Sequence, residues 1–211
     1  MEREGMKEIR NIIFDIGNVL VRFDPLDYLI RTYGEDFETI KLLHLNVFAG
    51  EEWKLLDQGL LTTEDAVARI EERIPEYKDA VEKIMHTWET FLIEEIRTSV
   101  YFLEKYKEMG YKIYALSNYP ERGFLYTERS FPVFKQFDGK VISYDVKEVK
   151  PGKRIYEILL EKYQLKPEEC IFIDDTLANI KSAEELGIKG IHYQHSNQLM
   201  ELYLSLSEDI K

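Results

Sequence analysis

Three aspartates stand where a sheet could bring their carboxylates together. Asp15 follows the apolar residues 11–14, and Asp174 and Asp175 follow the apolar residues 170–173. Carboxylates packed together raise one another's pKa unless a cation lies between them. An oxygen-rich acidic cluster suits Mg²⁺, which binds one or two carboxylates together with water and substrate phosphate. These three aspartates are therefore candidate magnesium ligands.

Ser117, Asn118 and Lys150 have types that suit a phosphoryl group. Ser117-Asn118 follows the apolar residues 113–116, and Lys150 stands before Pro151. The transition state of phosphoryl transfer needs its equatorial oxygens stabilised, which a hydroxyl, amides and one ammonium can do. A carboxylate beside such a group, here Asp15, can attack phosphorus to give an aspartyl-phosphate. We expect Lys150 to be exposed in the pocket, so that Lys150→Ala would reduce turnover and leave the fold intact.

Each of these residues also has a simpler structural interpretation. An aspartate after a strand is often a turn residue or a helix N-cap, and Ser117-Asn118 before Pro120 is good turn sequence. A single lysine is most often a solvated charge, and Asp174-Asp175 could merely complement the dipole of a following helix. The order of the set favours chemistry, because four separate coincidences along one chain are much less common than one.

Alternation of buried strands with amphipathic helices predicts an α/β fold around a parallel sheet. In such a sheet, ligands bind beyond the carboxyl ends of the strands, where the candidate residues stand. Helices are predicted over residues 154–163 and 179–186, and around Val100, Leu103 and Tyr106. The five apolar runs expected as strands are Asn11–Phe14, Lys112–Leu116, Lys140–Ser143, Cys170–Ile173 and Lys189–His192.

Residues 22–97 differ from the rest of the chain. They contain no convincing strand but several helical stripes. Thr62 begins a segment that resembles a capping box, and the apolar positions between Val81 and Leu92 form the strongest amphipathic stripe. Such a block is too long for a crossover between two strands. We therefore expect an inserted α-helical domain at 22–97 and an α/β domain made of 1–21 and 98–211.

Composition and charge exclude several classes of protein. The apolar fraction is 45%, with aromatic residues throughout, which excludes intrinsic disorder. A net charge of −12 disfavours binding to nucleic acid or to an anionic membrane surface. One cysteine, Cys170, excludes an intramolecular disulfide and is expected to be a buried small hydrophobe. The charged N-terminus has no apolar leader and no window is long enough to span a membrane, so we expect a cytoplasmic protein.

The ordered set resembles the four motifs of the haloacid dehalogenase superfamily of phosphohydrolases. The resemblance spans essentially the whole chain, because the helical block matches the cap that this family inserts after its first motif. It implies a three-layer, Rossmann-like sheet in the order 5-4-1-2-3, with Asp15 on the central strand. The branch looks like subfamily I, which includes sugar-phosphate phosphatases and the phosphatase domain of mammalian epoxide hydrolases. The motifs are Ile12-Ile13-Phe14-Asp15-Ile16-Gly17-Asn18-Val19, Ala115-Leu116-Ser117-Asn118, Lys150-Pro151-Gly152-Lys153-Arg154-Ile155-Tyr156 and Phe172-Ile173-Asp174-Asp175 running to Asn179.

The resemblance also implies a role for each motif residue. Asp15 would be the nucleophile and a magnesium ligand, and the main-chain carbonyl of Gly17 would be the second ligand. Asp174 would bind the metal directly, whereas Asp175 would act through water or orient the other ligands. Phosphoryl oxygens would be held by Ser117 and by the amide of Asn118, and Lys150 would neutralise the nucleophile and the phosphate. The resemblance thus implies a Mg²⁺-dependent phosphatase of a small phosphorylated metabolite, with a sugar phosphate as the expected substrate.

Gly17 departs from the family pattern. Phosphatases of this superfamily usually carry a second aspartate two residues after the nucleophile, as acid for the leaving alcohol and base for the hydrolytic water. A positioned acid–base group contributes about 10²–10⁴-fold. Its absence predicts a slower enzyme, a substrate with a better leaving group, or a substitute acid such as Asp175 or a cap side chain.

Three other functions stay open on the sequence. Dehalogenases of the superfamily also lack the second aspartate, but they use no Mg²⁺ and tend to lack acidic residues in the fourth motif. Asp174 and Asp175 therefore disfavour carbon–halogen hydrolysis. A non-catalytic binding protein could keep the fold without the acid–base group. A phosphoryl-transferring mutase is less favoured, because it also needs that group.

Overall fold

A five-stranded parallel sheet forms the centre of the protein in the computed structural model, which describes residues 9–208. The charged segment 1–8, to which the expectation about a leader applies, and residues 209–211 lie outside the described residues. The order β5-β4-β1-β6-β7 is the predicted order 5-4-1-2-3 read from the opposite edge, so the predicted fold class is confirmed. The strands are β1 (Asn11–Phe14), β4 (Lys112–Ser117), β5 (Gly139–Ile142), β6 (Cys170–Asp174) and β7 (Lys189–His192).

The register of the sheet brings the carboxyl ends of three strands to one edge. Asn11 of β1 is level with Lys112 of β4 on one side and with Cys170 of β6 on the other. All four residues of β1 are buried, as expected for a central strand covered on both faces. The residues that follow β1, β4 and β6 therefore emerge side by side.

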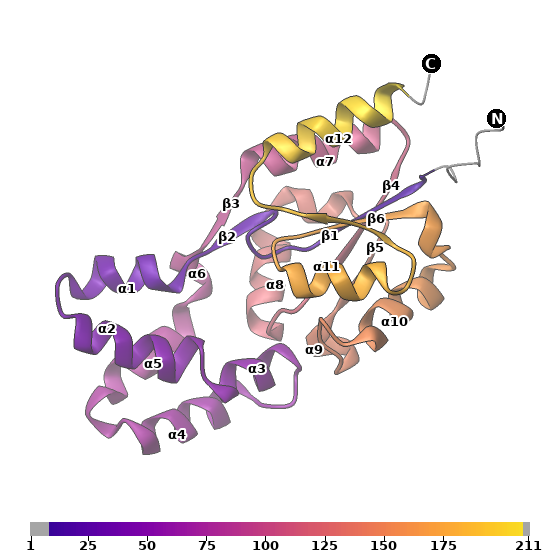
Figure 1. Ribbon diagram of the computed structural model, residues 1–211. Coiled ribbons are helices and arrows are strands. Elements are labelled where there is room, and N and C mark those ends of the chain that lie inside the picture. Colours follow the sequence, from indigo (N-terminus) through magenta and orange to yellow (C-terminus); the bar gives the residue numbers. More distant parts are fainter. Residues whose placement is uncertain (1–8, 209–211) are drawn as a thin grey trace.

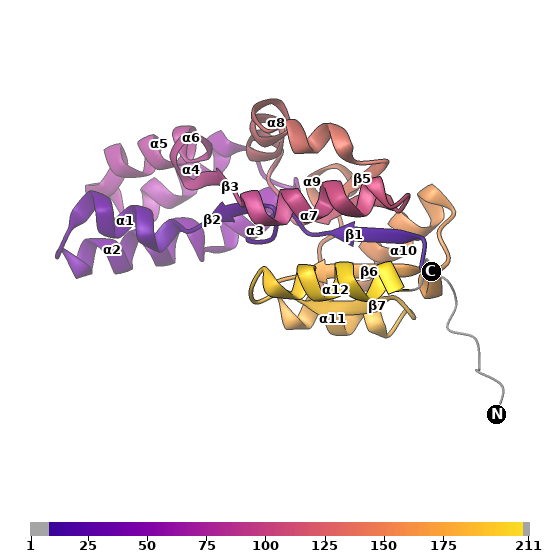
Figure 2. The ribbon, with the colours of Figure 1, turned by 90° about the horizontal axis from the view of Figure 1, so that it is seen from above.

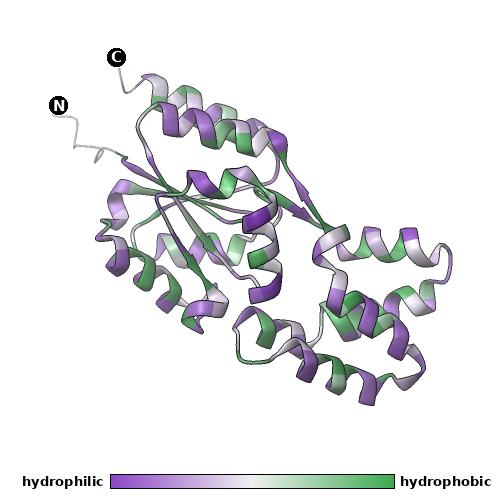
Figure 3. Cartoon of the chain, turned by 180° about the vertical axis from the view of Figure 1, so that it is seen from behind, coloured by the Kyte–Doolittle hydropathy of each residue, from purple (hydrophilic) through white to green (hydrophobic). Residues whose placement is uncertain are grey.

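Helices cover both faces of the sheet, as Figure 1 shows. Ile12 and Phe14 pack with the helices on one face, α7 (Arg97–Glu108) and α12 (Asn197–Glu208). Ile13, which points the other way, packs with α10 (Lys153–Tyr163) and α11 (Leu177–Glu184). This alternation is the two-residue period of a strand with a hydrophobic layer on each side. Figure 3 shows the resulting hydrophobic strands between helices of mixed polarity.

The predicted helices agree with the structure apart from their exact ends. The stretch predicted over 154–163 is α10, and the one predicted over 179–186 is α11, which begins two residues earlier. Gly187 follows α11 with φ of 88°, a left-handed conformation that favours glycine. Across the described part of the chain, no helix combines the length and the apolar character needed to cross a membrane. Two further helices of this part are α8 (Glu121–Ser130) and α9 (Ser143–Val146), and the 3₁₀ turns are Pro132–Gln136 and Pro167–Glu169.

A helical insertion projects from the sheet between β1 and α7 (Figures 1 and 2). Thr62 caps α4 as the sequence predicts, because its side chain accepts a hydrogen bond from the main-chain N–H of Asp65. The stripe between Val81 and Leu92 is not one helix but two, α5 and α6, which meet at Trp88. The insertion comprises α1 (Pro25–Tyr33), α2 (Phe37–Leu43), the π-helical turn His44–Phe48, α3 (Glu51–Asp57), α4 (Thr63–Arg73), the 3₁₀ turn Pro75–Tyr77, α5 (Lys78–Thr87) and α6 (Glu89–Leu92).

The expectation of no strand within 22–97 is wrong. Residues Val21–Phe23 (β2) and Ile93–Glu95 (β3) pair as an antiparallel ribbon that carries the insertion. Three-residue strands are too short to show an alternating pattern, and their pairing depends on residues 70 positions apart. On this layout we propose residues 22–97 as a cap domain and residues 1–21 with 98–211 as the core domain.

Candidate active site

The structure brings the three predicted aspartates together. Asp15 follows β1, Asp174 is the last residue of β6, and Asp175 comes next. Each offers an oxygen atom, and these atoms lie within 4.8 Å of one another. Asp15 and Asp174 are buried, and Asp175 is half-buried. The parallel register of β1 and β6 produces this cluster, as the sequence pattern predicts.

Lys150 lies between two of these carboxylates. Its Nζ is 2.8 Å from Oδ1 of Asp15 and 2.6 Å from Oδ2 of Asp174, and it donates to the main-chain carbonyl of Leu116 at 3.0 Å. The side chain is fully buried, so the expectation of an exposed pocket lysine is wrong. Burial disfavours the ammonium, but the charges of the two aspartates outweigh it and raise the pKa of Lys150. The cation can be buried because two anions and a carbonyl replace its water.

The electrostatics of the cluster fit an additional cation. Burial raises the pKa of Asp15 to about 7; the charge of Asp174 adds to this effect, and Lys150 and Ser117 oppose it. Burial and the charge of Asp174 also raise the pKa of Asp175. Three carboxylates against one ammonium leave an excess of negative charge among hard oxygen donors. Such a donor set suits a divalent cation such as Mg²⁺.

Asp174 is held in place by two residues whose roles the sequence analysis missed. Asn179 donates from Nδ2 to both carboxylate oxygens, at 3.0 and 3.1 Å, and the main-chain N–H of Thr176 donates to Oδ1 at 2.7 Å. Both residues come from the start of α11 and the turn before it. The fourth motif extends to Asn179 in the sequence, which was a signal that this side chain belongs to the site.

Ser117 and Asn118 contribute in different ways. Ser117, the last residue of β4, is buried and lies within hydrogen-bonding reach of Asp15. The Asn118 side chain instead binds the main chain of Lys150: Nδ2 donates to its carbonyl at 2.9 Å, and Oδ1 accepts from its N–H at 2.8 Å. The Asn118 side chain therefore positions the lysine, and this clamp was not predicted.

Gly17 leaves open space two residues after Asp15. A Cβ atom built at Gly17 would meet no other atom within 4 Å, and the residue is not in the left-handed region. Sterically, a side chain could stand there. Packing therefore does not require glycine at this position. With glycine here, no side chain stands where most phosphatases of the superfamily carry their acid–base aspartate.

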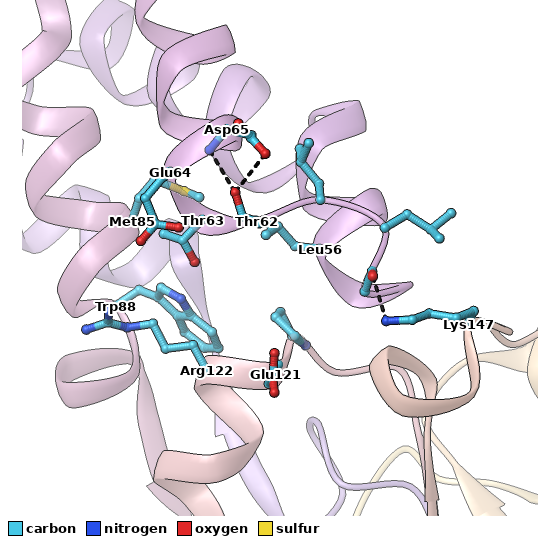
Figure 4. Close-up of a pocket in the computed structure, with 14 residues that line it drawn as sticks. Leu56, Thr62, Thr63, Glu64, Asp65, Met85, Trp88, Glu121, Arg122 and Lys147 are labelled. Atoms are coloured by element: carbon cyan, nitrogen blue, oxygen red, sulfur yellow. Dashed lines mark hydrogen bonds between the residues drawn. The ribbon is translucent and has the colours of Figure 1, made fainter.

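A cavity of about 410 Å³ lies between the cap and the core beside α3 (Figure 4). It is separate from the aspartate cluster, none of whose members lines it. Its wall combines the apolar Leu56, Met85 and Trp88 with polar and charged side chains from both domains. The polar and charged residues are Thr62, Thr63, Glu64, Asp65, Glu121, Arg122 and Lys147.

Comparisons with known proteins agree with this geometry. The chain is 26% identical over 187 residues to the phosphorylated carbohydrates phosphatase of Thermotoga maritima, covering 86% of this chain and 83% of that protein. It is 25% identical over 185 residues to a sesquiterpene phosphatase of Aspergillus oryzae, covering 87% and 89%.

A solved structure is similar over nearly the whole chain. It is a haloacid dehalogenase family enzyme from Bacteroides thetaiotaomicron in complex with magnesium and inorganic phosphate. The TM-score is 0.68 at 26% identity, over 88% of this chain and 94% of that chain. The family model of the haloacid dehalogenase-like hydrolases matches residues 9–187. The protein is a member of the haloacid dehalogenase-like hydrolase family.

Proposed function

We propose that this hydrolase cleaves the phosphomonoester of a small metabolite with Mg²⁺ as its cofactor. The observation that carries the proposal is the buried group of Asp15, Lys150 and Asp174 at the carboxyl ends of β1 and β6. The relatives named as phosphatases and the similar enzyme with bound magnesium and phosphate support it.

Asp15 is the proposed nucleophile. Its carboxylate attacks phosphorus, the bond between phosphorus and the alcohol oxygen breaks, and an aspartyl-phosphate forms; water then attacks phosphorus and frees Asp15. Lys150, Ser117 and the main-chain N–H of Asn118 hold the phosphoryl oxygens. Lys150 also lowers the pKa of Asp15 and so opposes the burial that disfavours its ionised form.

The residues proposed to hold Mg²⁺ are Asp15, Asp174 and the carbonyl of Gly17, with Asp175 acting through water. The ion would neutralise charge on the phosphoryl oxygens when bound. Asn179 and Thr176 orient Asp174 for this role.

A sugar phosphate is the substrate that we propose. The relative from Thermotoga maritima is named a phosphorylated carbohydrates phosphatase, which supports this substrate class. We further propose that the enzyme binds neither nucleic acid nor anionic membrane surfaces, because its net charge of −12 repels both. The cytoplasmic location stays a prediction from the sequence.

Phosphate release from a panel of sugar phosphates tests the proposal. We expect turnover with Mg²⁺, loss of turnover with EDTA, and loss in Asp15→Asn. Asp79→Asn removes an exposed cap carboxylate and serves as the matched control. Turnover undiminished by EDTA would refute the proposed requirement for Mg²⁺. Halide release from 2-haloacids without phosphate release would instead establish the dehalogenase alternative.

A further inference from the structure

The C-terminal end of α3 is tied to the segment that follows Ser117. Ser143, at the start of α9, donates its hydroxyl to the main-chain carbonyl of Asp57, the last residue of α3. The same hydroxyl oxygen accepts a hydrogen bond from the main-chain N–H of Tyr119 at 2.9 Å. Tyr119 is two residues beyond Ser117. Asp57 of the cap is therefore fixed relative to the phosphoryl-binding end of β4.

The turn after Asp57 makes a second set of contacts with the core. Gln58 donates from Nε2 to the carbonyl of Lys147 at 3.0 Å, and Lys147 donates from Nζ to the carbonyl of Gly59 at 2.6 Å (Figure 4). Gly59 has φ of 66°, and a Cβ there would lie 2.3 Å from the carbonyl oxygen of Tyr144. Only glycine permits so close an approach. The contacts of the Asp57 carbonyl and of the two residues that follow it hold this segment at the domain interface.

The carboxyl group of Asp57 lies within electrostatic reach of the nucleophile. The ionisable groups around it are Asp15 and Lys150 of the cluster and the hydroxyl of Tyr119. Burial raises the pKa of Asp57 to about 7; the charge of Asp15 adds to this effect and that of Lys150 opposes it. A half-buried carboxyl at the interface, with a raised pKa and within electrostatic reach of the nucleophile, has the properties expected of a general acid.

We propose that Asp57, reaching from the cap, is the acid–base catalyst that replaces the carboxylate missing at Gly17. The role rests on the proposed phosphatase function. When Asp15 attacks phosphorus and the bond to the leaving oxygen breaks, the Asp57 carboxyl gives its proton to that oxygen, so an alcohol leaves. The Asp57 carboxylate then accepts a proton from the water that attacks the aspartyl-phosphate, and phosphate leaves with Asp15 restored.

Asp57 fits this role better than the other nearby acid, Asp175. Asp175 belongs to the cluster that would hold the metal, and a cation there would keep it ionised. A ligand in that state has no proton to give. Asp57 comes from α3 of the cap and is not a member of the cluster.

Leaving-group dependence tests the proposal directly. The ratio kcat/KM reports the step in which the phosphorus–oxygen bond breaks. For glycerol phosphate, whose alkoxide needs a proton, Asp57→Asn should lower kcat/KM about 100- to 10,000-fold, but for p-nitrophenyl phosphate by less than about 5-fold. The variant should also show a burst of nitrophenol, because its second step lacks the base. The control Asp79→Asn, in the same domain, should leave kcat/KM unchanged for both esters.

A rescue experiment adds an independent measurement. The space at Gly17 admits a side chain, so Gly17→Asp in the Asp57→Asn background should restore turnover of glycerol phosphate. Asp57→Ser removes the same acid and should be rescued in the same way. A purely structural role for Asp57 would not be repaired by a carboxylate on β1's loop.

The possible failures are distinguishable. Asp57 is not the acid if Asp57→Asn lowers kcat/KM equally for both esters or for neither, or if Gly17→Asp gives no rescue. Phosphate release by the wild type would still support the phosphatase function in these cases. If the wild type releases no phosphate from any ester, the proposed function fails and the role of Asp57 fails with it.

Discussion

Lys150 shows at the residue scale how a charged side chain can be fully buried. Its ammonium exchanges water for Asp15, Asp174 and the carbonyl of Leu116. The sequence predicted the residue type but not the burial. The three contacts join Lys150 to residues 24, 34 and 135 positions away, and no local sequence pattern can indicate such pairings. The same holds for the clamp that Asn118 places on the main chain of Lys150.

Lys150→Ala should therefore destabilise the fold as well as abolish turnover. Removal of one partner leaves buried carboxylates without their cation, which typically costs about 3–5 kcal/mol. Urea unfolding at pH 7 measures this loss. The control is Lys153→Ala, since Lys153 pairs with Glu185 on the surface and its loss should change the free energy of unfolding far less. Equal unfolding free energies for the two variants would mean that Lys150 is not buried as described.

At the scale of elements, burial and short-range signals made most of the fold predictable. The three inner strands β1, β4 and β6 are mostly apolar and buried, and Thr62 marks the start of α4 in the sequence as it does in the structure. The ribbon of β2 and β3 was not predictable, because three residues cannot show a period. Nor was the break at Trp88, which continues the amphipathic stripe while the helix ends.

One carboxylate adds to the ladder that pairs the edge strand β5 with β4. The carboxylate of Asp138, just before β5, accepts a hydrogen bond from the main-chain N–H of Ile113 at 3.0 Å. It also forms an ion pair with Lys112 at 2.9 Å. Burial opposes ionisation of Asp138, but the Ile113 N–H and the charges of Lys112 and Lys107 outweigh it and lower the pKa. This carboxylate pins β5 to β4.

Asp138→Ala should lower the free energy of unfolding at pH 7 by about 1–3 kcal/mol, because the Ile113 N–H loses its partner. A carboxylate whose pKa is lower in the folded than in the unfolded state stabilises the fold at pH values above its unfolded-state pKa. This stabilisation is lost as the pH falls through the folded-state pKa. The difference between wild type and variant, measured by urea unfolding, should therefore narrow from pH 7 towards pH 3. Glu104→Ala, which removes an exposed carboxylate from the middle of α7, should show a much smaller pH-dependent difference. A gap that widens in acid would contradict the assigned ion pair.

For the whole molecule, the question is how a strongly acidic chain binds an anion. The net charge of −12 repels phosphate. At the site, one buried ammonium and a carboxylate cluster suited to Mg²⁺ provide positive charge that offsets this repulsion when the ion is bound. The sequence predicted this centre, since parallel strands deliver their carboxyl ends to one edge. It could not place the cap against that edge, because the contacts of Asp57 and Gly59 with the core depend on the relative position of the two domains.

Covalent phosphorylation of Asp15 is the most direct measurement of the central claim. The protein is mixed with Mg²⁺ and a radiolabelled sugar phosphate, quenched in acid within milliseconds to seconds, and assayed for protein-bound label. We predict a hydroxylamine-sensitive label on Asp15 that forms before phosphate is released, is absent in Asp15→Asn and disappears with EDTA. Release of phosphate without any labelled protein, or a label that persists in Asp15→Asn, would contradict an aspartyl-phosphate mechanism at this site.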